Sequence, residues 1–238
     1  MPNPSAIIFF DNRTTTALEA ILQLIEKAEG IDVAMAFLST GGRQRLRDAL
    51  TAFVERGGRL RVVLRRDRWR TSLSAVSALR ELPNSQVRFH PDPNFHAKRI
   101  NFYRGRKLAV LVGSANLTVG GLETNPEDGV ILELDAASSE GRQCSQTFET
   151  WWRESTPVTE AELQRLKAER GQRSSLRERE RVSTADPAGQ RQRHLQTARR
   201  LFEQARATED VNQRRRLVEQ AESHLAQARQ LERQQRRR

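Results

Sequence analysis

The chain has 238 residues, enough for one α/β domain of ordinary size and an extension, and its formal net charge of +11 favours a polyanionic partner. Cys144 is its single cysteine, which excludes an internal disulfide framework and a zinc site built from cysteines. No apolar run approaches the roughly eighteen residues that span a membrane, and the N-terminus lacks the basic region of a signal peptide, so we expect a cytoplasmic protein.

Short apolar segments alternate with amphipathic segments in the first part of the chain. Strands are expected over residues 6–10, 31–38, 60–64 and 86–90. Apolar residues recur at helical spacing between them, which predicts helices over residues 17–28, 46–54 and 73–82. Gly41 and Gly42 are expected to break the second strand. This rhythm predicts an α/β fold with a mixed, largely parallel sheet flanked by helices.

Two further strands are expected side by side over residues 98–102 and 108–112, joined by a short turn at 104–106. His96 and Lys98 are two residues apart, so both side chains leave the same face of the first of these strands. The small residues that end the second strand, where an amide and two polar groups can point outward, are Gly113, Ser114 and Asn116. The pattern therefore brings a histidine, a lysine and several hydrogen-bond donors together.

This set of residue types suits attack on a phosphodiester. An imidazole such as that of His96 is a nucleophile, and the Lys98 ammonium can bind a phosphate oxygen while Ser114 and Asn116 donate to the others. The carboxylate of Glu127 could orient the imidazole by accepting a hydrogen bond from its second nitrogen.

The order His-x-Lys, Gly-Ser-x-Asn and then Glu resembles the phospholipase D superfamily, also called the HKD enzymes, and most closely its short bacterial nucleases with one motif per chain. The resemblance is strong over residues 95–134 and extends over about residues 7–152. It implies cleavage without a metal or other cofactor, through a covalent phosphohistidine on His96. It also implies that Lys98, Ser114 and Asn116 bind phosphate and that Glu127 supports the imidazole.

Two features follow from this resemblance. The family motif continues to an aspartate, and Tyr103 stands at that position here. The mechanism also needs a second histidine to protonate the leaving oxygen, and one motif supplies only His96. We therefore expect a homodimer in which both subunits contribute to one active site.

A cluster of arginines follows the third expected strand: Arg65, Arg66, Arg68 and Arg70. Charged runs are often solvated faces, but loops at the carboxyl ends of strands rim the ligand crevice of an open α/β sheet. Contacts between some of these arginines and nucleic-acid phosphates are equally compatible with the sequence.

A last strand over residues 130–134 and a helix over residues 138–152 close a domain that we place at residues 1–155. Packing in the core or in a dimer is the favoured role of Trp151 and Trp152 in that helix. Residues 156–238 hold 20 Arg or Lys and 12 Asp or Glu, which predicts a basic, helical C-terminal extension.

Within this extension we expect a charged helix over residues 160–181, a linker over 182–189, and two amphipathic helices around Leu201 and Leu225. The two amphipathic helices predict a helical hairpin or a pair of coiled-coil segments. The extension could bind nucleic acid, a partner protein or a second copy of the chain.

The leading hypothesis is thus a nuclease that acts on DNA or RNA. Two alternatives remain: a phospholipid phosphodiesterase, and a catalytically silent module that keeps the fold and binds nucleic acid. The first lacks a convincing interfacial helix in this sequence, and the intact set around His96 argues against the second.

Overall fold

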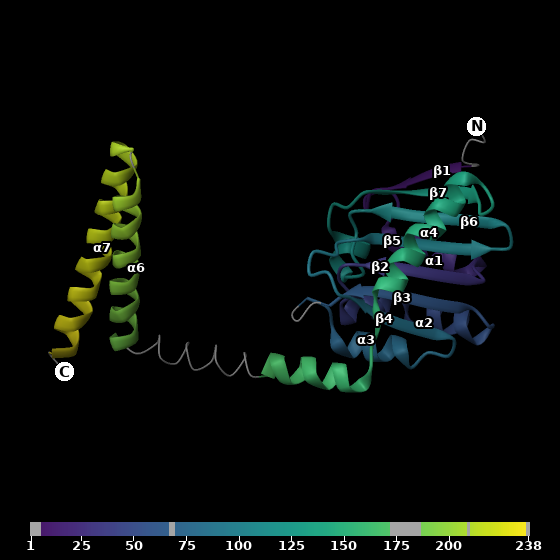
Figure 1. The fold of residues 1–238 in the computed structure, drawn as a ribbon, viewed down its shortest axis with the longest axis horizontal. Coiled ribbons are helices and arrows are strands. Elements are labelled where there is room, and N and C mark those ends of the chain that lie inside the picture. The colour runs from purple at the N-terminus through teal and green to yellow at the C-terminus, as the bar shows by residue number, and fades with distance from the viewer. Residues whose placement is uncertain (1–5, 67–69, 172–186, 209, 237–238) are drawn as a thin grey trace. The chain divides into compact units, whose positions relative to one another are not determined.

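The computed structural model describes residues 6–66, 70–171, 187–208 and 210–236 (Figure 1). The chain forms two compact units, Met1–Arg170 and Gly171–Arg238. The first holds the sheet and the second holds a pair of helices. Arg68, and the parts of the extension at 172–186, lie outside the described residues.

The elements of the first unit follow the expected order, with most bounds within a few residues of those expected. Its strands are β1 (Ala6–Phe10), β2 (Gly30–Met35), β3 (Arg59–Arg65), β4 (Ser85–His90), β5 (Lys98–Arg104), β6 (Lys107–Gly113), β7 (Gly129–Asp135) and β8 (Thr156–Pro157). Its labelled helices are α1 (Ala17–Lys27), α2 (Thr40–Glu55), α3 (Leu73–Arg80) and α4 (Ser139–Glu154), with a short π-helix, η1 (Gly120–Thr124). An unlabelled helix runs over residues 160–171.

All eight strands form one sheet in the order β1-β7-β6-β5-β2-β3-β4-β8. The mixed α/β architecture is confirmed, but parallel pairing is limited to β2 with β3 and β3 with β4. Every other described pair is antiparallel. The consecutive strands β5, β6 and β7 alternate in direction, and β5 pairs with β2 in the antiparallel sense. Parallel strands are therefore fewer than the strand–helix rhythm predicts.

The two faces of the sheet are covered differently. In Figure 1, α4 crosses the near face, while α1, α2 and α3 lie behind the sheet. The largest apolar cluster lies between the sheet and those three helices, and Phe53, Leu64 and Val76 are fully buried in it. On the α4 face, Phe148 and Trp152 pack together with strand residues, which confirms packing as the role of Trp152.

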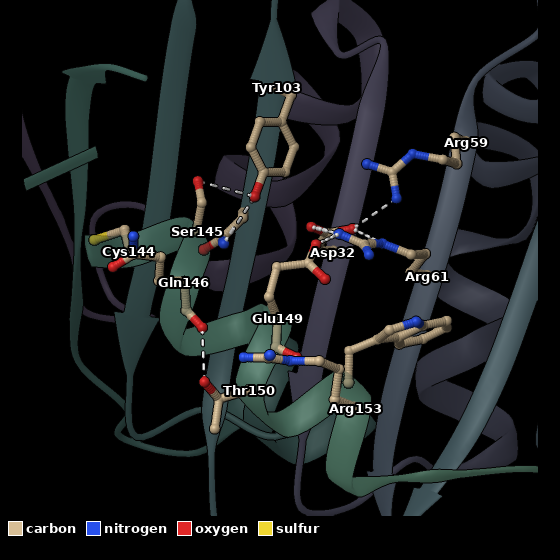
Figure 2. A network of polar contacts seen from close by, with 12 residues as sticks. Asp32, Arg59, Arg61, Tyr103, Cys144, Ser145, Gln146, Glu149, Thr150 and Arg153 are labelled. Atoms are coloured by element: carbon tan, nitrogen blue, oxygen red, sulfur yellow. Dashed lines mark hydrogen bonds and ion pairs between the residues drawn. The ribbon is translucent and has the colours of Figure 1, made fainter. Parts of the chain in front are cut away.

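A buried polar network joins the sheet to α4 (Figure 2). Asp32 on β2 is 0% exposed and accepts two hydrogen bonds from Arg61 of β3, at 2.8 and 2.7 Å. Arg61 also donates to Glu149 of α4 at 2.6 Å, and its guanidinium lies over Phe148. Buried charges are tolerated when they are paired in this way, so the network fixes α4 against the centre of the sheet.

Tyr103, the residue at the motif aspartate position, belongs to this same face. Its hydroxyl donates to Ser145 of α4 at 3.4 Å and accepts from Asn101 at 3.3 Å. Burial and the nearby Asp32 carboxylate raise the pKa of the phenol. The face that lacks the motif aspartate therefore contains a buried carboxylate on the neighbouring strand β2.

The first unit extends beyond the domain boundary expected after residue 155. Strand β8 pairs with β4, and the helix over residues 160–171 buries Leu163 and Leu166 in the main core. These two leucines dock the helix together with ion pairs to the rest of the first unit, in which Glu160 meets Arg80 and Glu162 meets Arg66. The compact unit ends at Arg170.

The second unit is a helical hairpin, as one of the two expected arrangements predicted. Its helices are α6 (Pro187–Ala207) and α7 (Val211–Arg236). Ala198, Leu201 and Ala221 form its buried cluster. Between the helices, Asp210 accepts hydrogen bonds from the backbone of Asn212 and Gln213, which caps the start of α7.

A candidate active site at one edge of the sheet

The expected site residues lie where four strands meet one edge of the sheet. Lys98 begins β5 and pairs with Met35 at the end of β2. Gly113 ends β6 and pairs with Gly129 at the start of β7. Because β5 and β6 are antiparallel, the residues just before Lys98 and just after Gly113 emerge side by side.

Gly113 and Gly129 allow a close approach at this edge. A Cβ atom on Gly113 would lie 2.4 Å from the carbonyl oxygen of Asp128, and one on Gly129 would lie 2.3 Å from the ring of Phe10. Neither separation is tolerated by a real side chain. Gly113 therefore has a packing role that places Ser114, in addition to the outward-pointing backbone amide that the sequence predicts.

The loop after Gly113 is held by backbone contacts to β2 and α2. Ser39 donates its N–H to the carbonyl of Leu117 at 2.9 Å, and Leu38 forms a bridge with Leu117. Gly42, in the first turn of α2, packs so closely that an added Cβ would lie 2.1 Å from the Leu117 oxygen. The two glycines expected to end the strand thus lie inside the helix.

His96 and Lys98 are in direct contact. The Lys98 Nζ lies 3.0 Å from Nδ1 and 3.2 Å from Nε2 of His96. The imidazole is exposed on its other side and meets the ring of Phe37 edge-on, with centroids 5.8 Å apart. Both expected side chains are therefore together and accessible to a substrate.

The surroundings of His96 are strongly cationic. Partial burial, then the charges of Lys98, Arg65 and Arg70, lower the pKa of its imidazole below the ordinary value. The pKa of Lys98 is also lowered, mainly by burial, although the carboxylate of Glu127 opposes this shift. These influences favour the neutral imidazole, which is the form that acts as a nucleophile.

Ser114 and Glu127 form a second part of the site. The Ser114 hydroxyl donates to the carboxylate of Glu127 and accepts from the N–H of Asp128 at 3.2 Å. Among the described residues no hydrogen bond joins Glu127 to His96, so in this state the carboxylate orients Ser114 instead. Glu127 still acts on Lys98 electrostatically.

Asn116 lies in the same loop, half-buried. Its backbone is in close contact with Gly121 of η1, where an added Cβ would lie 2.4 Å from the Asn116 oxygen. The Oδ1 atom of Asn116 is buried with no hydrogen-bond partner in the described part of the chain. A group that satisfies this amide would have to come from outside those residues.

The three arginines of the expected cluster that lie among the described residues, Arg65, Arg66 and Arg70, differ in their contacts. Arg65 and Arg70 both lie over the ring of Phe37, with guanidinium carbons 4.5 and 5.1 Å from its centroid. Arg66 is paired with Glu162 of the helix over residues 160–171 at 2.7 Å. Phe37 was not among the expected site residues, although an aromatic residue just after a buried parallel strand could have marked it.

The described residues were also compared with what a metal site and a membrane-spanning helix require. Across the described ranges, no group of three or more His, Cys, Asp or Glu side chains is placed to hold a metal ion. None of the helices in the described ranges combines the length and the apolar character that crossing a bilayer requires.

The chain is similar to known proteins in sequence and in fold. A family model described as "Cardiolipin synthase, PLD-like domain" matches residues 21–152. No curated protein matches the chain in sequence. Among solved structures, NucT from Helicobacter pylori aligns with a TM-score of 0.53 and 15% identity, covering 64% of this chain and 99% of that one. A phospholipase D family member, Nuc from Salmonella typhimurium, aligns with a TM-score of 0.52 and 20% identity, covering 64% and 97%.

Proposed function

The chain belongs to the family of PLD-like domains, and we propose that it is a metal-independent nuclease that cleaves DNA or RNA. The observation that carries this proposal is the contact between His96 and Lys98 beside the Ser114–Glu127 pair, all at one exposed sheet edge. The formal net charge of +11 supports a nucleic acid rather than an uncharged substrate.

In the proposed reaction the neutral imidazole of His96 attacks phosphorus and forms a phosphohistidine. Lys98 donates to a non-bridging oxygen, where negative charge grows in the transition state, and the Ser114 hydroxyl turns from Glu127 to donate to another. Asn116 completes this set from the adjoining loop. The leaving oxygen needs a proton at the same moment, and water must later displace the histidine.

A second copy of the chain is proposed to supply that proton through its own His96. A twofold axis near the site would place both imidazoles on opposite sides of one phosphate. The edge strand β1 supports such an association, because Ile7, Ile8 and Phe9 are exposed there and apolar strand edges are normally covered. Phe10 of the same strand packs at Gly129, next to the site.

Cleavage in EDTA tests the reaction. Labelled single- and double-stranded DNA and RNA are incubated with the wild-type protein, with His96→Ala, and with His194→Ala as a control in the hairpin. We expect cutting by the wild type and the control, and a loss of at least about 10³-fold in His96→Ala. The proposal is contradicted if His96→Ala still cuts a substrate as the wild type does. It is also contradicted if the wild type cuts none of the substrates.

Mixing tests the shared site. When subunits exchange between wild-type and His96→Ala protein, mixed dimers have one imidazole per site and are expected to be inactive. Activity should then fall faster than the wild-type fraction. A strictly linear decrease would show that each subunit acts alone.

A further inference from the structure

His90 is a buried histidine that the proposed reaction does not use. It ends strand β4, shortly before His96 in the sequence, and is 7% exposed. The backbone N–H of Asp92 donates to its Nδ1 atom at 3.2 Å. Because Nδ1 accepts this hydrogen bond, the ring hydrogen lies on Nε2, which donates to the carboxylate of Glu154 at the end of α4, at 3.3 Å. Both ring nitrogens are therefore satisfied, and the imidazole of His90 is held in one orientation.

A closed set of contacts joins His90 to the residue that precedes the nucleophile. Asp92 donates its N–H to His90, and the carbonyl of Asp92 accepts the N–H of Phe95 at 3.1 Å. The ring of Phe95 then stacks on the ring of His90, with centroids 4.3 Å apart and planes inclined by 17°. Phe95 also meets Trp151 of α4 edge-on. We call His90, Asp92 and Phe95 the loop clamp.

His96 follows the loop clamp directly, and the residue after it is also fixed. The carbonyl of Ala97 accepts the N–H of Ala36, just after β2, at 2.8 Å. The backbone of His96 is therefore held on one side by the sheet, through Ala97, and on the other side by His90, through Phe95. Such support matters for a nucleophile, because a misplacement of about 1 Å can cost about 10²-fold in rate.

We propose that His90 is a positioning residue for His96, which fixes the loop clamp so that the imidazole of His96 faces phosphorus. This inference deepens the proposed function and rests on it, because His96 has a target only if the chain cleaves a phosphodiester. The essential property of His90 is the acceptor at Nδ1. Stacking on Phe95 needs only an aromatic ring, whereas the N–H of Asp92 needs a nitrogen or oxygen that accepts it.

Substitutions at His90 separate the acceptor from the ring. His90→Phe keeps a ring that can stack on Phe95 but offers no acceptor to Asp92. His90→Asn has no ring, but its Oδ1 can take the place of Nδ1 and accept the same N–H. His90→Gln places its amide further out, toward Glu154, and so loses the acceptor without introducing an apolar ring. This third variant keeps the test decisive if His90→Phe does not fold.

His194→Phe is the matched control for these variants. His194 is a half-buried histidine of α6 whose ring contacts the ring of His224, so the same substitution is made at a histidine in the other compact unit. Thermal melting is measured for every variant, and the kinetic comparison is made below the melting transition.

Steady-state kinetics on bis(p-nitrophenyl) phosphate in EDTA measure the effect on the reaction. His90→Phe and His90→Gln should lower kcat about 10- to 100-fold and leave KM within about twofold, because the groups that bind phosphate stay in place. His90→Asn should keep kcat at least about fivefold above those two variants, and His194→Phe should match the unsubstituted protein. An unchanged kcat in His90→Phe and His90→Gln, or a loss as large in His90→Asn, would overturn the inference.

The ring of His96 provides a readout that does not require cleavage. Its edge-on contact with Phe37, with centroids 5.8 Å apart, should give a nuclear Overhauser effect between the two rings. This effect should weaken in His90→Phe and His90→Gln and persist in His90→Asn. Equal intensity in all of these proteins would overturn the inference. If the unsubstituted protein cuts no phosphodiester, the proposed function fails, and this measurement still decides whether His90 positions His96.

Discussion

The ammonium group of Lys98 lies 3.0 Å from Nδ1 of His96, so a cation directly faces the atom that would otherwise take up a proton. A protonated lysine donates to an unprotonated ring nitrogen, and its charge repels a second positive charge. The contact therefore favours the neutral form of the imidazole.

Replacement of Lys98 should move the titration of His96. The pKa of His96 is lowered by burial and by Lys98, Arg65 and Arg70, so its neutral form persists to a lower pH than in an ordinary histidine. Lys98→Met removes one of these causes, and the pKa should rise. The acidic limb of the pH–rate profile then moves to higher pH, and the NMR titration of the His96 ring follows it.

The ring titration makes this prediction independent of residual activity. Lys107→Met removes a lysine from the start of β6, at the opposite edge of the sheet, and should leave the His96 midpoint in place. A downward shift in Lys98→Met would contradict the assignment.

The hydroxyl of Ser114 is expected to contribute to the rate rather than to stability. Ser114→Ala removes the donor to Glu127 and a proposed donor to the phosphate, and kcat should fall about 10²-fold. Steady-state kinetics and thermal melting are measured on the same samples. Ser77→Ala removes a similar serine–glutamate hydrogen bond, from Ser77 on α3 to Glu81 just after that helix, and should leave kcat unchanged.

The buried carboxylate of Asp32 should be important for folding. Asp32→Asn leaves the guanidinium of Arg61, which is 15% exposed, without its charged partner on the sheet. Removing one member of a buried pair typically costs about 3–5 kcal/mol in the free energy of unfolding. Urea denaturation followed by circular dichroism measures this loss.

Asp48→Asn provides the comparison for Asp32. Asp48 is 93% exposed in its pair with Arg47, so the same substitution should change the free energy of unfolding by no more than about 0.5 kcal/mol. Similar losses in the two variants would mean that the network is not a folding determinant.

The close approach at Gly113 gives a prediction about the sheet edge. Gly113→Ala forces a Cβ atom against Asp128, and the strands must separate locally, at a cost of about 1–3 kcal/mol. Because Ser114 follows directly, kcat should fall as well. Gly171→Ala, at a position where a Cβ meets no atom within 4 Å, should leave both stability and kcat essentially unchanged.

The two compact units should be separable. A chain that ends at Arg170 retains the whole sheet and the helix that buries Leu163 and Leu166, so it should fold with a melting transition close to that of the full chain. If the basic hairpin binds nucleic acid, this shorter chain should bind an oligonucleotide more weakly and with a shallower salt dependence. If the shorter chain binds the oligonucleotide as tightly as the full chain, the hairpin does not contribute to nucleic-acid binding.

The local parts of the site could be predicted because they depend on short-range patterns. His96, Lys98 and Ser114 are linked by one hairpin, whose register follows from strand alternation and a short turn. Phe37 and Arg65 join them only through the pairing of β2, β3 and β5, which no local pattern encodes. The same limit explains why antiparallel pairing was underestimated.

Long-range contacts also explain the errors in element bounds. Gly42 looks like a strand breaker in sequence, but its missing side chain makes room for the loop at Leu117, and α2 begins before it. Leu163 and Leu166 are too few to define an amphipathic helix, yet both are completely buried. In both segments, packing against residues distant in the sequence determines the structure, and local propensity does not.

The carboxylate of Asp32 has a consequence for how relatives of this chain are found. A search pattern that demands aspartate five positions after Lys98 rejects this sequence, since Tyr103 stands there. The folded sheet nevertheless carries a buried acid one strand away, with Arg61 as its partner and Tyr103 in its field. A search for a buried carboxylate at this place in the sheet would accept this chain, whereas the sequence pattern rejects it.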